Sequence, residues 1–315
     1  MKFRRLALAL LLLSSVFFVF AEVEQENQEN QENPLNKKLD TRGLLPLHAK
    51  DIEEGSYEIE TASSSSMFKI EKTVLYVKDN AMTADITLSG KGYSNVTMLS
   101  AADSEGLTSL EGTTAAVGKD GKYVFTLPVQ SLNTELVCSA FSKKKQKWYE
   151  RRVVFYSEKI PAENLFVTPY VMQKCALKDG SYTIGVKLSG GSGRASVKSP
   201  AAMSVKDGIP LARIEWSSPN YDYMILNGEK ILPLANEQNS VFELPVLVFD
   251  KPMSVFADTR AMSTPHEILY QLEFSLSTAE QKGSMTFALV IAAIFLLTVA
   301  LVLFLVMRLC FKKEK

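Results

Sequence analysis

The sequence repeats itself, and this internal duplication is the feature that most limits how the chain can fold. Three short segments recur in the same order at offsets of 125, 128 and 117 residues. Because the order is kept and the offsets drift little, we expect insertions to fall in loops and the chain to hold two homologous modules, at residues 51–158 and 176–277. The matched segments are Gly55-Ser56-Tyr57 with Gly180-Ser181-Tyr182, Val77-Lys78-Asp79 with Val205-Lys206-Asp207, and residues 125–129 (FTLPV) with residues 242–246 (FELPV).

Each module has the residue pattern of short β-strands. Apolar and polar residues alternate with a period of two in runs such as residues 122–128 and 269–275, and Gly, Asn, Asp, Ser and Pro bound these runs. Before residue 285 there is no helical apolar stripe of ten or more residues. Many short strands separated by turn residues predict an all-β fold, a β-sandwich or barrel, in each module. Residues 159–175, with Pro161 and Pro169, are predicted to be the linker between them.

The N-terminal region has the pattern of a targeting signal followed by a spacer. Residues 1–5 are basic, residues 6–20 are apolar, and small or β-branched residues precede position 22, so we expect a cleaved signal peptide at residues 1–21. Residues 22–50 repeat the triplet Gln-Glu-Asn and have no apolar periodicity, which predicts a disordered polar leader.

The C-terminal region has the pattern of a membrane anchor. Residues 285–307 form a run of 23 residues without a charge, long enough as a helix for a hydrocarbon core of roughly 30 Å. The basic tail, residues 308–315, follows directly, and the positive-inside bias places it in the cytoplasm. We therefore expect a single-pass cell-membrane protein with residues 22–284 outside.

Charge and histidine content narrow the functional classes. The chain has 35 basic and 35 acidic side chains, but residues 22–284 hold 28 basic and 34 acidic ones, a difference of −6, which gives no reason to expect nucleic-acid binding. His48 and His266 are the two histidines, and the sequence has no HExxH, GxGxxG or CxxC motif. These features argue against an enzyme and against a multi-histidine metal site. The run Gly190-Gly191-Ser192-Gly193 has no following Lys-Ser/Thr and predicts a wide hairpin turn.

Two cysteines leave two interpretations open. Cys138 and Cys175 can pair in an oxidising compartment, or each can be a small buried apolar residue.

Three groups of side chains are candidates for ligand binding. The first is Tyr221, Tyr223 and Met224, which follow Pro219-Asn220 at the end of a predicted strand. Such residues can cover a flat apolar ligand, with a phenol oxygen or thioether sulfur near a metal centre. They can equally be core or cross-strand packing.

The second group is His266 and Tyr270 in the last hairpin. A spacing of four residues on a strand projects both side chains from the same face, where an imidazole or phenolate can ligate a metal complex. A histidine after a proline can also be a hydrogen-bonded turn residue.

The third group lies in the matching hairpin of the first module, residues 142–152. Its basic residues interleave with aromatic rings and can hold an acidic ligand such as a propionate or a polyanion, or can simply be a solvated turn. The candidate residues here are Lys143, Lys144, Lys145, Trp148 and Tyr149.

The tandem pattern, with NYDYM at residues 220–224, the hairpin at residues 258–268 and SKKKQKWYER at residues 142–151, resembles bacterial iron-transport-associated surface proteins of the NEAT (near iron transporter) family. The resemblance covers nearly all of residues 55–277. It implies tandem immunoglobulin-like β-sandwiches that bind haem between a short lip and the final hairpin, where a Tyr-x-x-x-Tyr pair supplies the iron ligand. Here that strand reads His266-x-x-x-Tyr270, and the first copy has Lys147 and Arg151 instead.

The resemblance implies that the second module binds haem or another iron complex and passes it to a transporter component. His266 or Tyr270 would then be the axial ligand, and Tyr221, Tyr223 and Met224 the lip. The alternative is a structural or adhesive surface protein whose paired modules bind a protein and no small molecule.

Overall fold

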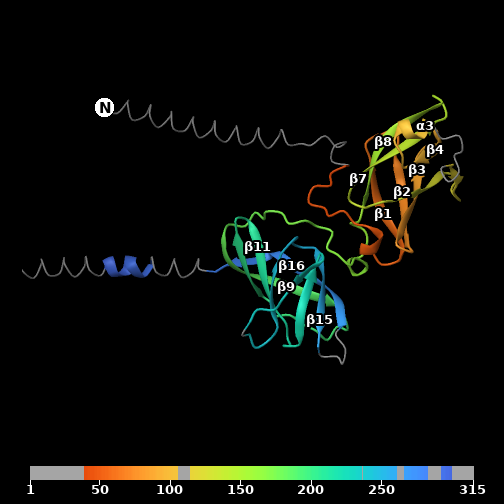
Figure 1. Ribbon diagram of the computed structural model, residues 1–315. Helices are drawn as coiled ribbons and strands as arrows, with labels where there is room; N and C mark the ends of the chain where they lie inside the picture. Colours follow the sequence, from red (N-terminus) through yellow and green to blue (C-terminus); the bar gives the residue numbers. More distant parts are fainter. Residues whose placement is uncertain (1–38, 106–113, 236, 261–265, 283–291, 300–315) are drawn as a thin grey trace, which may run out of the picture. The chain divides into compact units, whose positions relative to one another are not determined.

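The computed structural model describes residues 39–105, 114–235, 237–260, 266–282 and 292–299. Strands dominate these residues, and before residue 283 the helices among them are η1 (Ala49–Asp51), α3 (Ala101–Glu105) and η2 (Ala162–Asn164). The prediction of an all-β protein is therefore confirmed (Figure 1).

The strands form two eight-stranded sheets. The first sheet has the order β4-β7-β8-β1-β2-β3-β6-β5, and the second has the order β13-β12-β15-β16-β9-β10-β11-β14. The strands of the first sheet are β1 (Gly55–Ser63), β2 (Ile70–Lys78), β3 (Ala81–Leu88), β4 (Tyr93–Thr97), β5 (Ala116–Val117), β6 (Tyr123–Pro128), β7 (Glu135–Ser142) and β8 (Lys147–Tyr156). Those of the second are β9 (Gly180–Gly190), β10 (Ala201–Lys206), β11 (Ile209–Glu215), β12 (Tyr221–Leu226), β13 (Glu229–Ile231), β14 (Val241–Pro245), β15 (Pro252–Thr259) and β16 (His266–Gln281).

The chain divides into two compact units around these sheets. Among the described residues, unit 1 contains 39–42, 56–76 and 81–159, and unit 2 contains 43–55, 77–80 and 160–299.

The two sheets repeat one strand order. β1-β2-β3-β4-β6-β7-β8 correspond in sequence order and position to β9-β10-β11-β12-β14-β15-β16. Even the register agrees, because Ile86 lies opposite Phe125 in unit 1 and Ile214 lies opposite Phe242 in unit 2. A bulge also follows the first residue of β4 and of β12. The segments that match in sequence thus occupy equivalent places in the two sheets.

Unit 2 has one core, to which seven strands contribute. Alternate residues point inward, as in β11, where Pro210, Ala212 and Ile214 are buried between more exposed neighbours. A sheet whose strands all bury one face against the same core must curl around it, and each large side chain buried there stabilises the fold by about 1.5–3 kcal/mol. The largest buried side chains of this core include Trp216, Phe242, Phe274 and Ile184.

Unit 1 is built in the same way. Its fully buried side chains come from several strands and include Phe68, Leu75, Ile86, Phe125 and Phe155. An antiparallel bridge between Asn95 of β4 and Thr114, which precedes β5, joins the two edges of the sheet. The curled sheet of unit 1 is therefore partly closed.

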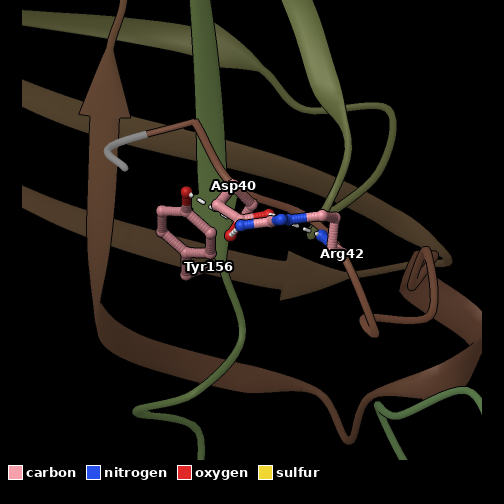
Figure 2. A network of polar contacts seen from close by, with 3 residues as sticks. All are labelled: Asp40, Arg42 and Tyr156. Atoms are coloured by element: carbon pink, nitrogen blue, oxygen red, sulfur yellow. Dashed lines mark hydrogen bonds and ion pairs between the residues drawn. The ribbon is translucent and has the colours of Figure 1, made fainter. Parts of the chain in front are cut away.

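Residues 39–42 are held against β8 of unit 1. Figure 2 shows Asp40, Arg42 and Tyr156 together. Arg42 donates from Nε to the Asp40 carboxylate at 2.9 Å, and the Tyr156 hydroxyl donates to the Asp40 carbonyl oxygen at 3.3 Å. This polar network fixes the chain just before it enters unit 2.

The prediction of a disordered leader over residues 22–50 is wrong for its last eight residues, 43–50. Of residues 22–50, those up to 38 lie outside the described residues, but residues 43–50 are ordered in unit 2. Leu47 is fully buried, and Leu44 forms an antiparallel bridge with Tyr170. The physical reason is the apolar run Leu44-Leu45-Pro46-Leu47, whose burial outweighs the polar composition of the residues before it.

The predicted linker, residues 159–175, is also packed in unit 2. Thr168 is buried and donates from Oγ1 to the Ser254 carbonyl oxygen at 3.1 Å. Asn227 accepts from the Thr168 backbone N–H at 2.7 Å and donates to the Thr168 carbonyl oxygen at 3.1 Å. The segment that follows η2 is therefore a fixed part of this unit.

The two predicted end segments fall largely outside the described residues. The predicted signal peptide, residues 1–21, lies wholly outside them. Of the predicted anchor, residues 285–307, the structure describes residues 292–299, which are helical. In the described part of the chain, no helix combines the length and the apolar character needed to cross a membrane.

Candidate functional site

Three aromatic side chains of unit 2 form a cluster at one end of the curled sheet. The rings of Trp216 and Tyr221 stack with centroids 3.9 Å apart, and Tyr270 meets Trp216 edge-on at 5.1 Å. The hydroxyl oxygens of Tyr221 and Tyr270 lie 3.5 Å apart. We call Trp216, Tyr221 and Tyr270 the aromatic cluster.

Local hydrogen bonds place Tyr221 in this cluster. The chain leaves β11 at Trp216, turns through residues 217–220 and enters β12 at Tyr221. Ser240 fixes both ends of the turn: its carbonyl oxygen accepts from the Trp216 N–H at 2.9 Å, and its hydroxyl accepts from the Tyr221 N–H at 3.0 Å. The turn therefore has one conformation that stacks the two rings.

A glycine turn lies over Tyr270. Gly190 ends β9 with φ +92°, and Gly191 follows with φ +56°, a backbone conformation that side chains disfavour. A Cβ on Gly191 would lie 2.6 Å from Cε1 of Tyr270. Residues 191–200 then run as a ten-residue loop to β10, so the predicted wide hairpin turn is a longer loop whose first residues cover the Tyr270 ring.

The cluster is buried, and one of its polar atoms has no partner. Tyr270 is 2% exposed and Trp216 is 0% exposed. The indole Nε1–H of Trp216 is buried and makes no hydrogen bond within the described residues. Burial and the neighbouring Tyr270 hydroxyl raise the pKa of Tyr221, so this phenol is held protonated at neutral pH.

His266 and Tyr270 share a face of β16, but they are not brought to one point. His266 is exposed at the first residue of the strand, opposite Thr259, while Tyr270 is opposite Val255. Four residues of strand span about 13 Å, so the imidazole lies at the exposed start of β16 and the phenol lies in the core. Among the described residues, no group of three or more His, Cys, Asp or Glu side chains could hold a metal ion.

Tyr223 and Met224 point to opposite faces of β12. Met224 is fully buried in the core, as the packing alternative predicted. Tyr223 points outward, donates to Glu267 Oε1 at 2.8 Å and lies beneath the ammonium group of Lys230 at 3.4 Å. The hydrogen bond to Glu267 raises the pKa of Tyr223 to about 12. These residues do not form a lip opposite His266, because only Tyr221 reaches the aromatic cluster.

The equivalent end of unit 1 has a different chemistry. The pairing of β8 with β1 and of β16 with β9 makes Lys147 equivalent to His266 and Arg151 equivalent to Tyr270. Arg151 faces Cys138, and its guanidinium lies 5.2 Å from the Tyr149 ring. Its Nε–H is buried and has no partner among the described residues.

The predicted basic hairpin of unit 1 is formed by β7 and β8. Trp148 packs edge-on against Phe141, with centroids 5.4 Å apart, on the opposite face of β8 from Tyr149. Lys143 donates to the Tyr123 hydroxyl at 2.7 Å, whereas Lys144 and Lys145 are exposed in the turn. Trp148 therefore stabilises the hairpin, and the lysines face solvent.

Both described cysteines are free thiols. Cys138 is buried in β7, and this burial raises its pKa to about 12. For Cys138 the structure agrees with the alternative of a small buried apolar residue.

Sequence reasoning missed residues that build these sites. Three residues that contact Tyr221 or Tyr270 were not predicted from the sequence, namely Trp216, Gly191 and Ser240. It was also not predicted that Lys91 and Tyr123 lie beside the basic hairpin. A usable signal existed for Trp216, since it aligns with Leu88 of the first copy at a core position. The contacts of Ser240 and Tyr123 bridge strands distant in sequence and leave no local pattern.

Comparison with known proteins gives limited information. No family model matches the chain, and no curated protein matches it. Among solved structures, one described as a mutant of IsdX2-NEAT5 in complex with heme is similar over 31% of this chain and 97% of that chain, with 19% sequence identity and a TM-score of 0.27. A likeness at this level assigns neither a fold nor a ligand to the protein.

Proposed function

We propose that the protein is an extracytoplasmic binding protein, anchored in the cell membrane by residues 285–307, whose unit 2 captures haem or another iron complex for a transporter. The binding end would be the aromatic cluster together with His266. The observation that carries this proposal is the pair of tyrosine hydroxyls 3.5 Å apart in a cluster with Trp216, whose buried indole N–H has no partner among the described residues.

The chemistry of this donor set fits haem. Tyrosine oxygen and histidine nitrogen are both axial ligands of haem iron in proteins, and aromatic rings supply the apolar walls that a porphyrin needs. The Trp216 N–H would gain an acceptor on a ligand, which would relieve an unsatisfied buried donor. A bound haem iron would supply the Lewis acidity that favours the phenolate form of a ligating tyrosine.

Access to Tyr270 requires movement of the glycine turn. The turn residues Gly191–Gly193 are exposed and follow the end of β9, so displacing them leaves the pairing of Gly190 with Tyr270 intact. His266 is already exposed at the start of β16 and needs no such movement. We therefore infer that a ligand first meets His266 and reaches Tyr270 only when the turn lifts.

A hemin titration of the full-length chain tests the proposal. The Soret band should shift on binding, and the shift should weaken in His266→Ala and in Tyr270→Phe, which removes only the hydroxyl. Tyr182→Phe and His48→Ala are matched controls, because Tyr182 is a buried tyrosine bonded to the Lys178 carbonyl oxygen and His48 is the other histidine. An unshifted spectrum, or equal loss in the controls, contradicts haem binding by this site.

One observation favours the second candidate function, a structural or adhesive surface protein that binds another protein. The outward face of unit 2 carries an apolar row, Ile225, Phe256 and Leu269, which lie side by side on three adjacent strands. Phe166, 36% exposed, packs beside Phe256 at 6.4 Å. If hemin does not bind, recovery of a defined partner with wild-type protein but not with Phe166→Ser would support this function.

Membrane anchoring has its own test. The apolar run and the basic residues that follow it support a single crossing with the C-terminus inside. The full-length chain should stay in membranes after alkaline carbonate washing, and a chain ending at residue 284 should be released. Release of the full-length chain would contradict the anchor.

A further inference from the structure

The cations at the hairpin end of unit 1 form one surface. Lys143–Lys145 occupy the turn between β7 and β8, and the Lys143 N–H donates to the Gly92 carbonyl oxygen at 2.9 Å, which brings the 89–92 loop alongside. Lys91 and Lys143 share the Tyr123 ring at 5.8 and 4.2 Å. We define the basic surface as Lys91, Lys143, Lys144, Lys145, Lys147 and Arg151.

Among the described residues, these cations have no acidic partners, whereas other cations of unit 1 do. Lys72 pairs with Glu58 at 3.0 Å and Lys159 pairs with Glu60 at 3.1 Å, and Lys122 and Arg152 also have carboxylate partners. Within the described part of the chain, no residue of the basic surface forms an ion pair with Asp or Glu. The surface therefore keeps a local excess of positive charge on a body, residues 22–284, whose net charge is −6.

Aromatic rings hold the like charges together. Lys147 lies 4.9 Å and Arg151 lies 5.2 Å from the Tyr149 ring, and Lys91 and Lys143 likewise share the Tyr123 ring. The hydrogen bond from Lys143 lowers the pKa of Tyr123, as expected near several uncompensated cations.

We propose that this basic surface of unit 1 binds a linear polyanion that carries phosphate or sulfate groups. A single small anion would neutralise one or two cations, whereas five cations along a turn and a strand, with Lys91 in the neighbouring loop, match a chain of repeated charges. Lysine ammonium groups suit phosphate and sulfate as point charges, and the buried unpaired Nε–H of Arg151 adds a directed donor at the inner end. This site is separate from the aromatic cluster and does not depend on haem binding.

The test measures binding of fluorescently labelled inorganic polyphosphate, and in parallel of heparin, to the full-length chain by fluorescence anisotropy at several salt concentrations. The test variant replaces Lys143, Lys144, Lys145 and Lys147 by Gln. The control variant replaces four other exposed lysines by Gln and so changes the net charge equally: Lys69, Lys78, Lys187 and Lys206.

The test variant should lose affinity roughly 10- to 100-fold at low salt, and the slope of log K against log salt should fall in magnitude by about 2–3, since each lost contact to a flexible polyanion contributes about 0.7. The control variant should bind within about two-fold of wild type. Preference for polyphosphate or for heparin identifies the charged group, and either supports the proposal. If the quadruple variant does not fold, Lys144→Glu in the exposed turn should still weaken binding.

Three results would overturn the proposal. One is the absence of binding to either polymer at low salt. Another is an equal loss in the test and control variants, which would mean that net charge alone drives binding. The third is binding to phosphatidylglycerol vesicles that neither soluble polymer displaces, which would assign the surface to a lipid membrane.

Discussion

Replacing Gly191 by Ala tests whether the glycine turn packs on Tyr270 as described. Two costs add at this position. A side chain at φ +56° is strained by about 1–2 kcal/mol, and the new Cβ, 2.6 Å from the Tyr270 ring, overpacks the cluster by roughly another 1–3 kcal/mol. We expect unit 2 to lose about 2–5 kcal/mol of unfolding free energy.

Gly193 separates these two costs. Its φ is +73°, but a Cβ there meets nothing within 4 Å, so Gly193→Ala carries the backbone strain alone and should cost about 1–2 kcal/mol. The difference between the two variants measures the contact with Tyr270.

The assay is urea unfolding followed by Trp216 fluorescence. The chain has two tryptophans, so Trp148→Phe is used as the background to make the signal specific for unit 2. In a Tyr270→Ala background, Gly191→Ala should lose most of its excess cost over Gly193→Ala, because the ring that the new Cβ overpacks is gone. A double-mutant cycle of the two substitutions gives the free energy of this interaction. Equal losses in Gly191→Ala and Gly193→Ala would refute the contact between the turn and the ring.

Three further predictions concern other parts of the chain. Asn133→Ala should destabilise unit 1 by about 1–3 kcal/mol in urea unfolding, because the buried Asn133 amide bonds both the hydroxyl and the N–H of Ser157 at 2.9 Å. Glu267→Gln should lower the pKa of Tyr223 from about 12, measured by ultraviolet titration against Tyr223→Phe. Because folding raises the pKa of Tyr223, its protonated phenol contributes to the stability of the folded protein. This contribution is complete below about pH 10 and is lost as the pH rises towards 12. Cys138 should react with a thiol reagent only after unfolding, in a variant whose other cysteines are Ser; rapid reaction of the folded protein at pH 8 would contradict the burial.

The fold class was predictable from the sequence because its signals are local. Alternation in residues 122–128 and 269–275 corresponds to β6 and to part of β16, where inward and outward residues differ in burial. The duplication was also visible, since core positions such as Ile86 and Ile214 keep both their residue type and their neighbours in the sheet.

The candidate site was less predictable because the depth at which a side chain is buried does not depend on the local sequence alone. Period-two alternation correctly places His266 and Tyr270 on one face of β16, but it does not say where along the strand the core begins. Where the core begins along β16 depends on Gly191 and Trp216, which contact Tyr270 from segments distant in the sequence. The same reasoning explains the leader: the burial of Leu47 depends on unit 2, not on the polar residues that precede it.

Comparison of the two copies explains how one fold could serve two kinds of ligand. At equivalent register positions, unit 2 has His266 and Tyr270 where unit 1 has Lys147 and Arg151. A protonatable imidazole and a phenol can ligate a metal, whereas an ammonium and a guanidinium can only attract anions. The two units share the strand order and the bulge in β4 and β12, so the side chains at these equivalent positions can be compared directly. If hemin binds unit 2 through these positions of β16, Lys147→His with Arg151→Tyr should introduce a Soret shift into unit 1 and, by removing two cations, weaken polyphosphate binding. A variant that shows no Soret shift and binds polyphosphate as wild type does would mean that the loops, rather than these strand positions, determine what each unit binds.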